Sequence, residues 1–80
     1  MKLPRDLSGY ELVKVLARLG YVVNHQTGSH IRLTTQYNGE HHLTIPAHDP
    51  IKIGTLNAIL RDVAAHAGIS RDELLTMLFS

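Results

Sequence analysis

The chain has 80 residues, of which 44% are hydrophobic and 19% are charged, so we expect one folded domain over residues 1–80. It has no cysteine, which excludes disulfides and cysteine zinc sites, and no apolar run long enough to cross a bilayer. A net charge of +1 is small for a nucleic-acid binder, so any such contact must use a local patch. Without a basic and then apolar leader at its start, the protein is expected to be soluble and cytoplasmic.

The first predicted helix starts at a capping box and ends at a glycine. Ser8 and Glu11 have the spacing at which each side chain bonds the other's backbone N–H group. Leucines recur along one helical face up to Leu19, and Gly20 supplies the C-terminal stop. The leucine stripe predicts that this face packs in the core.

Three strand candidates follow the first helix, and turn signals separate them. The strands are predicted over residues 21–26, 29–35 and 41–46, which are rich in β-branched residues or alternate in polarity. Thr27-Gly28 is predicted as a two-residue hairpin turn, and Asn38-Gly39 as a second turn. Short connections of this kind favour an antiparallel sheet.

Two helices complete the chain. The first is expected from about Thr55 to Ala67 and ends at Gly68, because its apolar residues recur at helical spacing. The second, from Arg71 to Leu78, follows another capping box formed by Ser70 and Glu73. The element order α-β-β-β-α-α predicts an α+β fold, a three-stranded antiparallel sheet with helices packed on one face.

Strand alternation predicts which side chains the helices leave uncovered. On the second strand Ile31 and Leu33 should face the helices, because successive side chains point to opposite faces. The open face should then hold polar residues of the second and third strands, namely His30, Arg32, Thr34, His42 and Thr44.

The length and position of the first turn decide which residues of the first strand lie on the open face. With a two-residue turn at Thr27-Gly28, Gln26 pairs with Ser29 and His25 lies opposite His30 on the open face. A three-residue loop or a bulge would reverse that parity for the first strand.

The six histidines give no pattern typical of a metal site. Neither tight two-by-two spacing nor a helical i, i+4 pair occurs among His25, His30, His41, His42 and His48. A serine nucleophile is also disfavoured, because Ser29 and His30 are strand neighbours that point to opposite faces.

General acid–base chemistry fits the open face better. An exposed imidazole can take or give a proton near neutral pH, and a guanidinium on the same face can bind a phosphate. His30 and Arg32 have this arrangement, and RNA cleavage needs no more in principle. On the residues alone, His30 as an ordinary solvated strand residue remains the alternative.

Three motifs stand in a distinctive order along the chain. They are Gly28-Ser29-His30, Ile45-Pro46-x-His48, and Gly54-Thr55-Leu56 followed by Ile59-Leu60. With these motifs, the sequence from about Leu7 to Leu78 closely resembles the HicA (YcfA-like) family of toxin–antitoxin mRNA interferases.

The resemblance implies a fold similar to a double-stranded-RNA-binding domain and an endoribonuclease activity on mRNA. It implies that His30 is catalytic and that Gly28 and Ser29 form the turn that delivers it and approach the RNA phosphate. It implies no metal or small-molecule cofactor, and a HicB-like antitoxin that blocks the active site. Arg32 and His25 are added as RNA-binding residues from strand geometry and not from the motif.

The chain also departs from the family pattern. Gln26-Thr27 stands where many relatives have a basic residue before the glycine, and His41-His42 stands where basic residues are frequent. Both changes lower the local charge. The alternative function is a non-catalytic RNA-binding or antitoxin-binding module on the same fold. His48 is expected to be structural or near the site, and His66 to face solvent.

Overall fold

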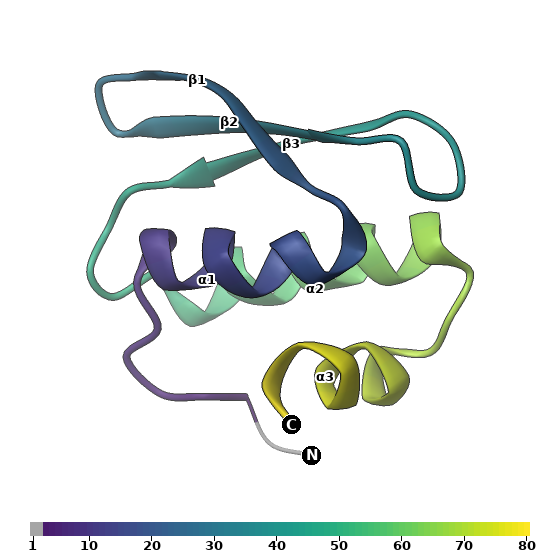
Figure 1. Ribbon diagram of the computed structural model, residues 1–80. Helices are drawn as coiled ribbons and strands as arrows, with labels where there is room; N and C mark the ends of the chain where they lie inside the picture. Colours follow the sequence, from purple (N-terminus) through teal and green to yellow (C-terminus); the bar gives the residue numbers. More distant parts are fainter. Residues whose placement is uncertain (1–2) are drawn as a thin grey trace.

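Three α-helices, one 3₁₀ turn and a three-stranded sheet form the part of the chain that the computed structural model describes, residues 3–80 (Figure 1). The elements are α1 Gly9–Leu16, η1 Ala17–Leu19, β1 Val22–Thr27, β2 His30–Thr35, β3 His41–Pro46, α2 Ile53–Ala67 and α3 Arg71–Phe79. This order confirms the predicted one. Within residues 3–80, no helix has both the length and the apolar character needed to span a membrane.

Capping boxes begin α1 and α3, as predicted. The Ser8 hydroxyl accepts the Glu11 N–H at 3.1 Å, and the Glu11 carboxylate accepts the Ser8 N–H at 2.9 Å. This second bond is the main cause that holds the pKa of Glu11 below its ordinary value. Ser70 and Glu73 make the same pair of bonds. The predicted first helix is α1 continued by η1, and Gly20 ends it with a φ of +80°.

Arg18 in η1 caps the C-terminal end of α3. The last turn of α3 has no basic residue of its own. The guanidinium donates to the carbonyl oxygens of Met77, Leu78 and Ser80 at 2.9, 3.3 and 3.3 Å. Because the last carbonyls of a helix lack partners within it, this contact satisfies them and ties α3 to the end of the first helix.

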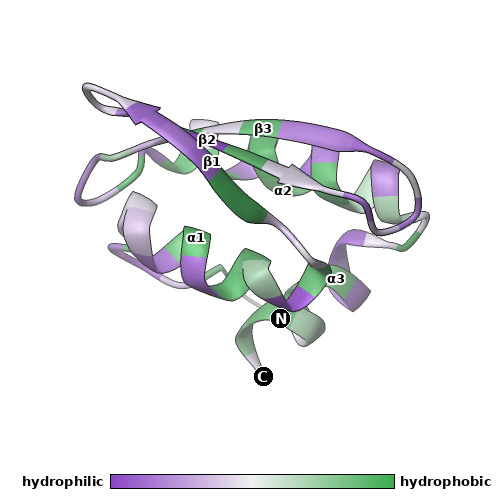
Figure 2. Ribbon diagram, turned by 45° about the horizontal axis from the view of Figure 1, so that its top comes forward, coloured by the Kyte–Doolittle hydropathy of each residue, from purple (hydrophilic) through white to green (hydrophobic). Residues whose placement is uncertain are grey.

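The sheet is antiparallel in the order β1-β2-β3, and the helices lie on one side of it (Figure 1). The core lies between the sheet and the helices α1 and α2, and it continues between these two helices and α3 (Figure 1). The sheet contributes Ile31, Leu33, Leu43 and Ile45, and the helices contribute Leu12, Leu16, Leu56, Leu60, Leu74, Leu75 and Leu78. Figure 2 shows that β1 is hydrophobic where it begins and hydrophilic toward its end. The predicted α+β arrangement, with one open sheet face, is confirmed.

The start of α1 packs tightly against the end of β3. The Gly9 N–H donates to the carbonyl oxygen of His48 at 2.9 Å. A β-carbon at Gly9 would clash with the Pro46 carbonyl oxygen and would lie 3.0 Å from the α-carbon of Ala47. Only glycine allows this close approach, which fixes the first turn of α1 beside the end of the sheet where the β1–β2 turn lies.

Candidate active site on the open face of the sheet

The side of the sheet that faces away from the helices, here called the open face, carries polar side chains. On β2 the exposed His30 and Arg32 flank Ile31, which is only 1% exposed. On β3 the same alternation leaves His42 and Thr44 exposed. The predicted division of β2 and β3 into a core side and an open side is confirmed.

The turn between β1 and β2 differs from the prediction by one residue. Thr27 pairs with His30, so the two turn residues are Gly28 and Ser29 rather than Thr27 and Gly28. Gly28 has a φ of +56°, and a type II′ hairpin turn requires a positive φ at this first central position. The predicted pairing of His25 with His30 is therefore wrong.

The corrected register moves the partner of His25 by two positions. His25 pairs with Arg32, and Gln26 pairs with Ile31 rather than with Ser29. Because directly paired residues share a face, His25 still lies on the open face with Arg32. The β-bulge of β1 comes before His25 in the chain, so it does not reverse the parity of this residue.

The open-face residues beside this turn form what we call the hairpin site: His25, His30 and Arg32, with the turn residues Gly28 and Ser29. These residues bring together every RNA-contacting and catalytic position that the sequence predicted. A β-carbon at Gly28 would meet no atom within 4 Å, so the backbone of the turn is open to a ligand.

Two contacts hold the turn against the rest of the molecule. The Gln26 side-chain amide donates to the Tyr10 hydroxyl at 2.8 Å and to the Gly28 carbonyl at 3.0 Å. The Ala47 N–H donates to the Ser29 carbonyl at 2.7 Å. All of β1 is exposed, and the bond between Gln26 and Tyr10 is the only side-chain hydrogen bond between β1 and a helix within residues 3–80. Gln26 thus braces the hairpin.

His42 shares the open face but not the hairpin site. Its Nδ1 lies 2.9 Å from the Thr34 hydroxyl and its Nε2 lies 3.1 Å from the Glu40 carboxylate. Because a carboxylate only accepts, Nε2 donates to Glu40, and in the neutral ring Nδ1 then accepts from the hydroxyl. Bonds from Gln36 and then His42 lower the pKa of Glu40. His30 and Thr34 are four positions apart on β2, which corresponds to about 13 Å.

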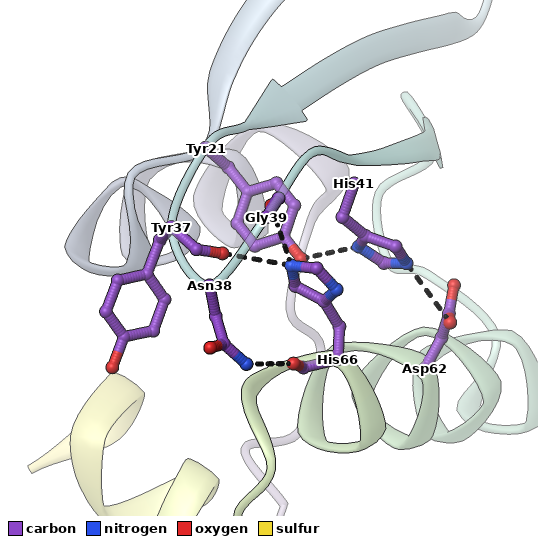
Figure 3. Close-up of polar contacts among 7 residues, drawn as sticks. All are labelled: Tyr21, Tyr37, Asn38, Gly39, His41, Asp62 and His66. Atoms are coloured by element: carbon purple, nitrogen blue, oxygen red, sulfur yellow. Dashed lines mark hydrogen bonds and ion pairs between the residues drawn. The ribbon is translucent and has the colours of Figure 1, made fainter.

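A second group of histidines lies where β3 begins beside α2 (Figure 3). We call Tyr21, His41, Asp62 and His66 the histidine stack. The Tyr21 hydroxyl lies 2.7 Å from His41 Nδ1, and the Asp62 carboxylate lies 3.3 Å from His41 Nε2. The His41 and His66 rings are stacked, with centroids 4.3 Å apart. Burial, with a smaller effect from the charge of Asp62, raises the pKa of Tyr21 to about 12.

His66 also fastens the turn between β2 and β3 to α2. Its Nε2 donates to the carbonyl oxygens of Tyr37 and Gly39 at 2.9 and 3.0 Å, and the Asn38 amide donates to its carbonyl at 2.8 Å (Figure 3). Asn38 and Gly39 lie in this predicted turn, and both have positive φ, which asparagine and glycine adopt more readily than other residues. The expectation that His66 faces solvent is wrong, because this turn folds back over the end of α2.

Sequence reasoning gave no role to Tyr10, Tyr21 or Asp62. Asp62 and His66 stand four residues apart, which places them on one face of α2 and is the one local signal of the histidine stack. Tyr21 and Tyr10 meet their partners only through the tertiary fold. No local pattern could have found these contacts.

The six histidines therefore fall into two groups. Hydrogen bonds engage the ring nitrogens of His41, His42 and His66. Within residues 3–80, the rings of His25, His30 and His48 have no hydrogen-bond or ion-pair partner. His48 follows the end of β3, whereas His25 and His30 lie on the open face. His25 and His30 can thus exchange a proton with a bound ligand without breaking an internal bond.

The charge of the hairpin site is also uncompensated. The ion pairs found within residues 3–80 involve His41 and His42, so Arg32 has no acidic partner there. The same residues contain no group of three or more histidines, cysteines, aspartates or glutamates arranged to hold a metal ion. A free guanidinium between exposed imidazoles suits an anion, and above all a phosphate group.

Comparison with known proteins identifies the family. The family model described as HicA toxin of bacterial toxin–antitoxin matches residues 9–65, which is more than half of the chain. This range includes the whole sheet and most of α2. The comparisons with curated proteins and with solved structures gave no match. The family match and the arrangement of the sheet and helices agree with the resemblance seen in the sequence, and the chain belongs to the HicA toxin family.

Proposed function

We propose that this HicA toxin is a metal-independent endoribonuclease that cleaves mRNA, with His30 as a general acid or base. One observation carries the proposal: among residues 3–80, neither the exposed imidazole of His30 nor Arg32, two residues along the open face, has an internal ion-pair or hydrogen-bond partner. Membership in a family of toxins of toxin–antitoxin systems supplies the biological setting.

The chemistry requires only groups that the hairpin site offers. A neutral imidazole can remove the proton of an RNA 2′-hydroxyl, whose oxygen then attacks the adjacent phosphorus. Arg32 would offset the negative charge that develops on the phosphate oxygens. The backbone at Gly28 and Ser29 would approach the phosphate from the turn, where no side chain blocks access to Gly28.

The partner that we propose is a HicB-like antitoxin that covers the open face. The family pairs a toxin with an antitoxin, and the polar, unpaired hairpin site is the surface that an inhibitor must cover to keep RNA away. We also propose that the chain acts in the cytoplasm, where mRNA is available.

Induced expression in bacteria tests the toxin role. We expect the wild type to arrest growth and deplete mRNA, and His30→Ala to do neither. His42→Ala is the matched control, because His42 lies on the same face with both ring nitrogens engaged, and this variant should remain toxic. Equal growth arrest and mRNA loss for wild type and His30→Ala would contradict the proposal. RNA retention without cleavage between about pH 5 and 8 would instead favour a binding module.

A further inference from the structure

We propose that His25 is a second catalytic residue of the same reaction, so that His25 and His30 act as an acid–base pair across the β1–β2 hairpin. The inference rests on the proposed ribonuclease function and goes beyond it in assigning the second proton transfer. It comes from the register of the two strands, which places His25 opposite Arg32 and Thr27 opposite His30.

This register puts the two imidazoles at diagonal positions on the same face. Diagonal neighbours in an antiparallel pair lie about 7–8 Å apart, within reach of long side chains. Arg32 stands directly opposite His25 and two residues from His30, so all three side chains leave the same face of the sheet at neighbouring positions. A phosphate held by Arg32 would then lie within reach of both imidazoles, so that one could take a proton and the other could give one.

No other histidine of the described residues fits the second role as well. His42 is about 13 Å away along the sheet, and both of its ring nitrogens are engaged. His48 lies beyond the end of β3, in the segment whose backbone bonds to the start of α1. Among the residues of 3–80 that pair with or flank His25 and His30 on the open face, Arg32 is the one charged side chain. Thr27, Thr44 and Pro46 do not titrate, and the helices cover the opposite face.

Two features of β1 near His25 hold this residue at a fixed position in the sheet. A β-bulge lies just before it in β1, and bulges commonly re-aim a side chain beside an active site. On its other side, Gln26 ties β1 to Tyr10 of α1 and to the turn. These two features hold an otherwise exposed edge strand in one register.

The step balances without any further reactant. One neutral imidazole takes the 2′-hydroxyl proton while the 2′-oxygen forms a bond to phosphorus. The bond from phosphorus to the 5′-oxygen breaks, and the other imidazole, in its protonated form, gives its proton to that leaving oxygen. The products are a 2′,3′-cyclic phosphate and a 5′-hydroxyl, and solvent restores the two protonation states.

A leaving-group experiment tests the assignment. We would measure cleavage of a short RNA by wild type, His25→Ala, His30→Ala and the control His42→Ala, and compare it with the same RNA carrying sulfur at the 5′-bridging position. Both hairpin variants should lose about 10²–10⁴-fold in rate on the oxygen substrate. On the sulfur substrate, whose leaving group needs no proton, one of the two should recover and the other should not. The wild-type rate should be bell-shaped in pH, and each variant should lose one limb.

The outcomes separate the two proposals. If His30→Ala is inactive while His25→Ala keeps the wild-type rate and the bell-shaped profile, only the second catalytic role is overturned. If both variants lose activity and neither recovers on the sulfur substrate, or both recover equally, the acid–base pairing is overturned. A wild type that cleaves neither substrate, or a fully active His30→Ala, overturns the proposed function and the pairing with it.

Discussion

The hairpin site and the histidine stack place the same residue type at opposite ends of one sheet, in opposite surroundings. In the stack, His41 bonds to a buried tyrosine and to Asp62 and packs on His66. In the hairpin site, His25 and His30 are exposed and have no internal partner within residues 3–80. An imidazole satisfied by the protein stabilises the fold, whereas an imidazole left unsatisfied is available to a ligand.

The comparison predicts that substitutions at the two places change different properties of the protein. Substitutions in the histidine stack should lower stability and leave the cleavage rate of the folded protein unchanged. Substitutions in the hairpin site should lower the cleavage rate and leave stability nearly unchanged, because exposed positions without bonds contribute little to it, within about 0.5 kcal/mol.

His41→Ala should give the largest stability loss. It leaves the hydroxyl of Tyr21, which is 2% exposed, without its partner, and a buried unsatisfied polar group costs about 1–3 kcal/mol. Each kcal/mol lowers the unfolding midpoint of a domain of this size by about 4–8 °C. Thermal unfolding measures the effect, with His42→Ala as the exposed control. A variant that melts like the wild type, or that stays folded but no longer cleaves RNA, would break the comparison.

The second largest effect is expected from alkaline pH, which should lower the stability of the fold through the Tyr21 hydroxyl of the histidine stack. The pKa of Tyr21 is raised to about 12 in the folded protein, against an ordinary value of 10.0. Because the unfolded chain loses this proton first, the stabilising contribution is complete below pH 10.0 and is lost as the pH rises toward about 12. Urea unfolding over this range should show a steeper decline for wild type than for Tyr21→Phe. Parallel declines would contradict the burial of the Tyr21 hydroxyl.

The smallest effect is expected for the hydrogen bond between Gln26 and Tyr10, here called the brace, which ties the hairpin to α1. Tyr10→Phe and Gln26→Leu should each cost about 0.5–1 kcal/mol, because the bond between them is exposed. Since both changes remove the same bond, the double variant should lose less than the sum of the single losses. Urea unfolding of the four proteins gives the coupling. Fully additive losses would show that the brace does not form in solution.

Strand alternation predicted the open face from the sequence, although the turn was misplaced. Thr27-Gly28 and Gly28-Ser29 are both acceptable hairpin turns, because a glycine suits either central position in different turn types. Moving the turn by one residue shifts the pairing by two, and a shift of two keeps every side chain on its face. The face of His25 was thus predictable from the two-residue turn, whereas its partner was not.

The histidine stack lay beyond sequence reasoning for a different reason. Its contacts join residues 20 and more positions apart, from the start of β1, the start of β3 and the end of α2. His66 looked like a solvent-facing helix residue because its surroundings depend on where the β2–β3 turn folds back. Local pattern predicts elements and faces, but contacts between elements depend on the tertiary packing.

The most direct test of the account is cleavage of one defined RNA by purified wild type and His30→Ala, with both product ends identified. We expect 2′,3′-cyclic phosphate and 5′-hydroxyl ends for wild type. His30→Ala should cleave at a rate about 10²–10⁴-fold lower, at an unchanged unfolding midpoint. Equal rates for the two proteins, or products with 3′-hydroxyl and 5′-phosphate ends, would contradict it.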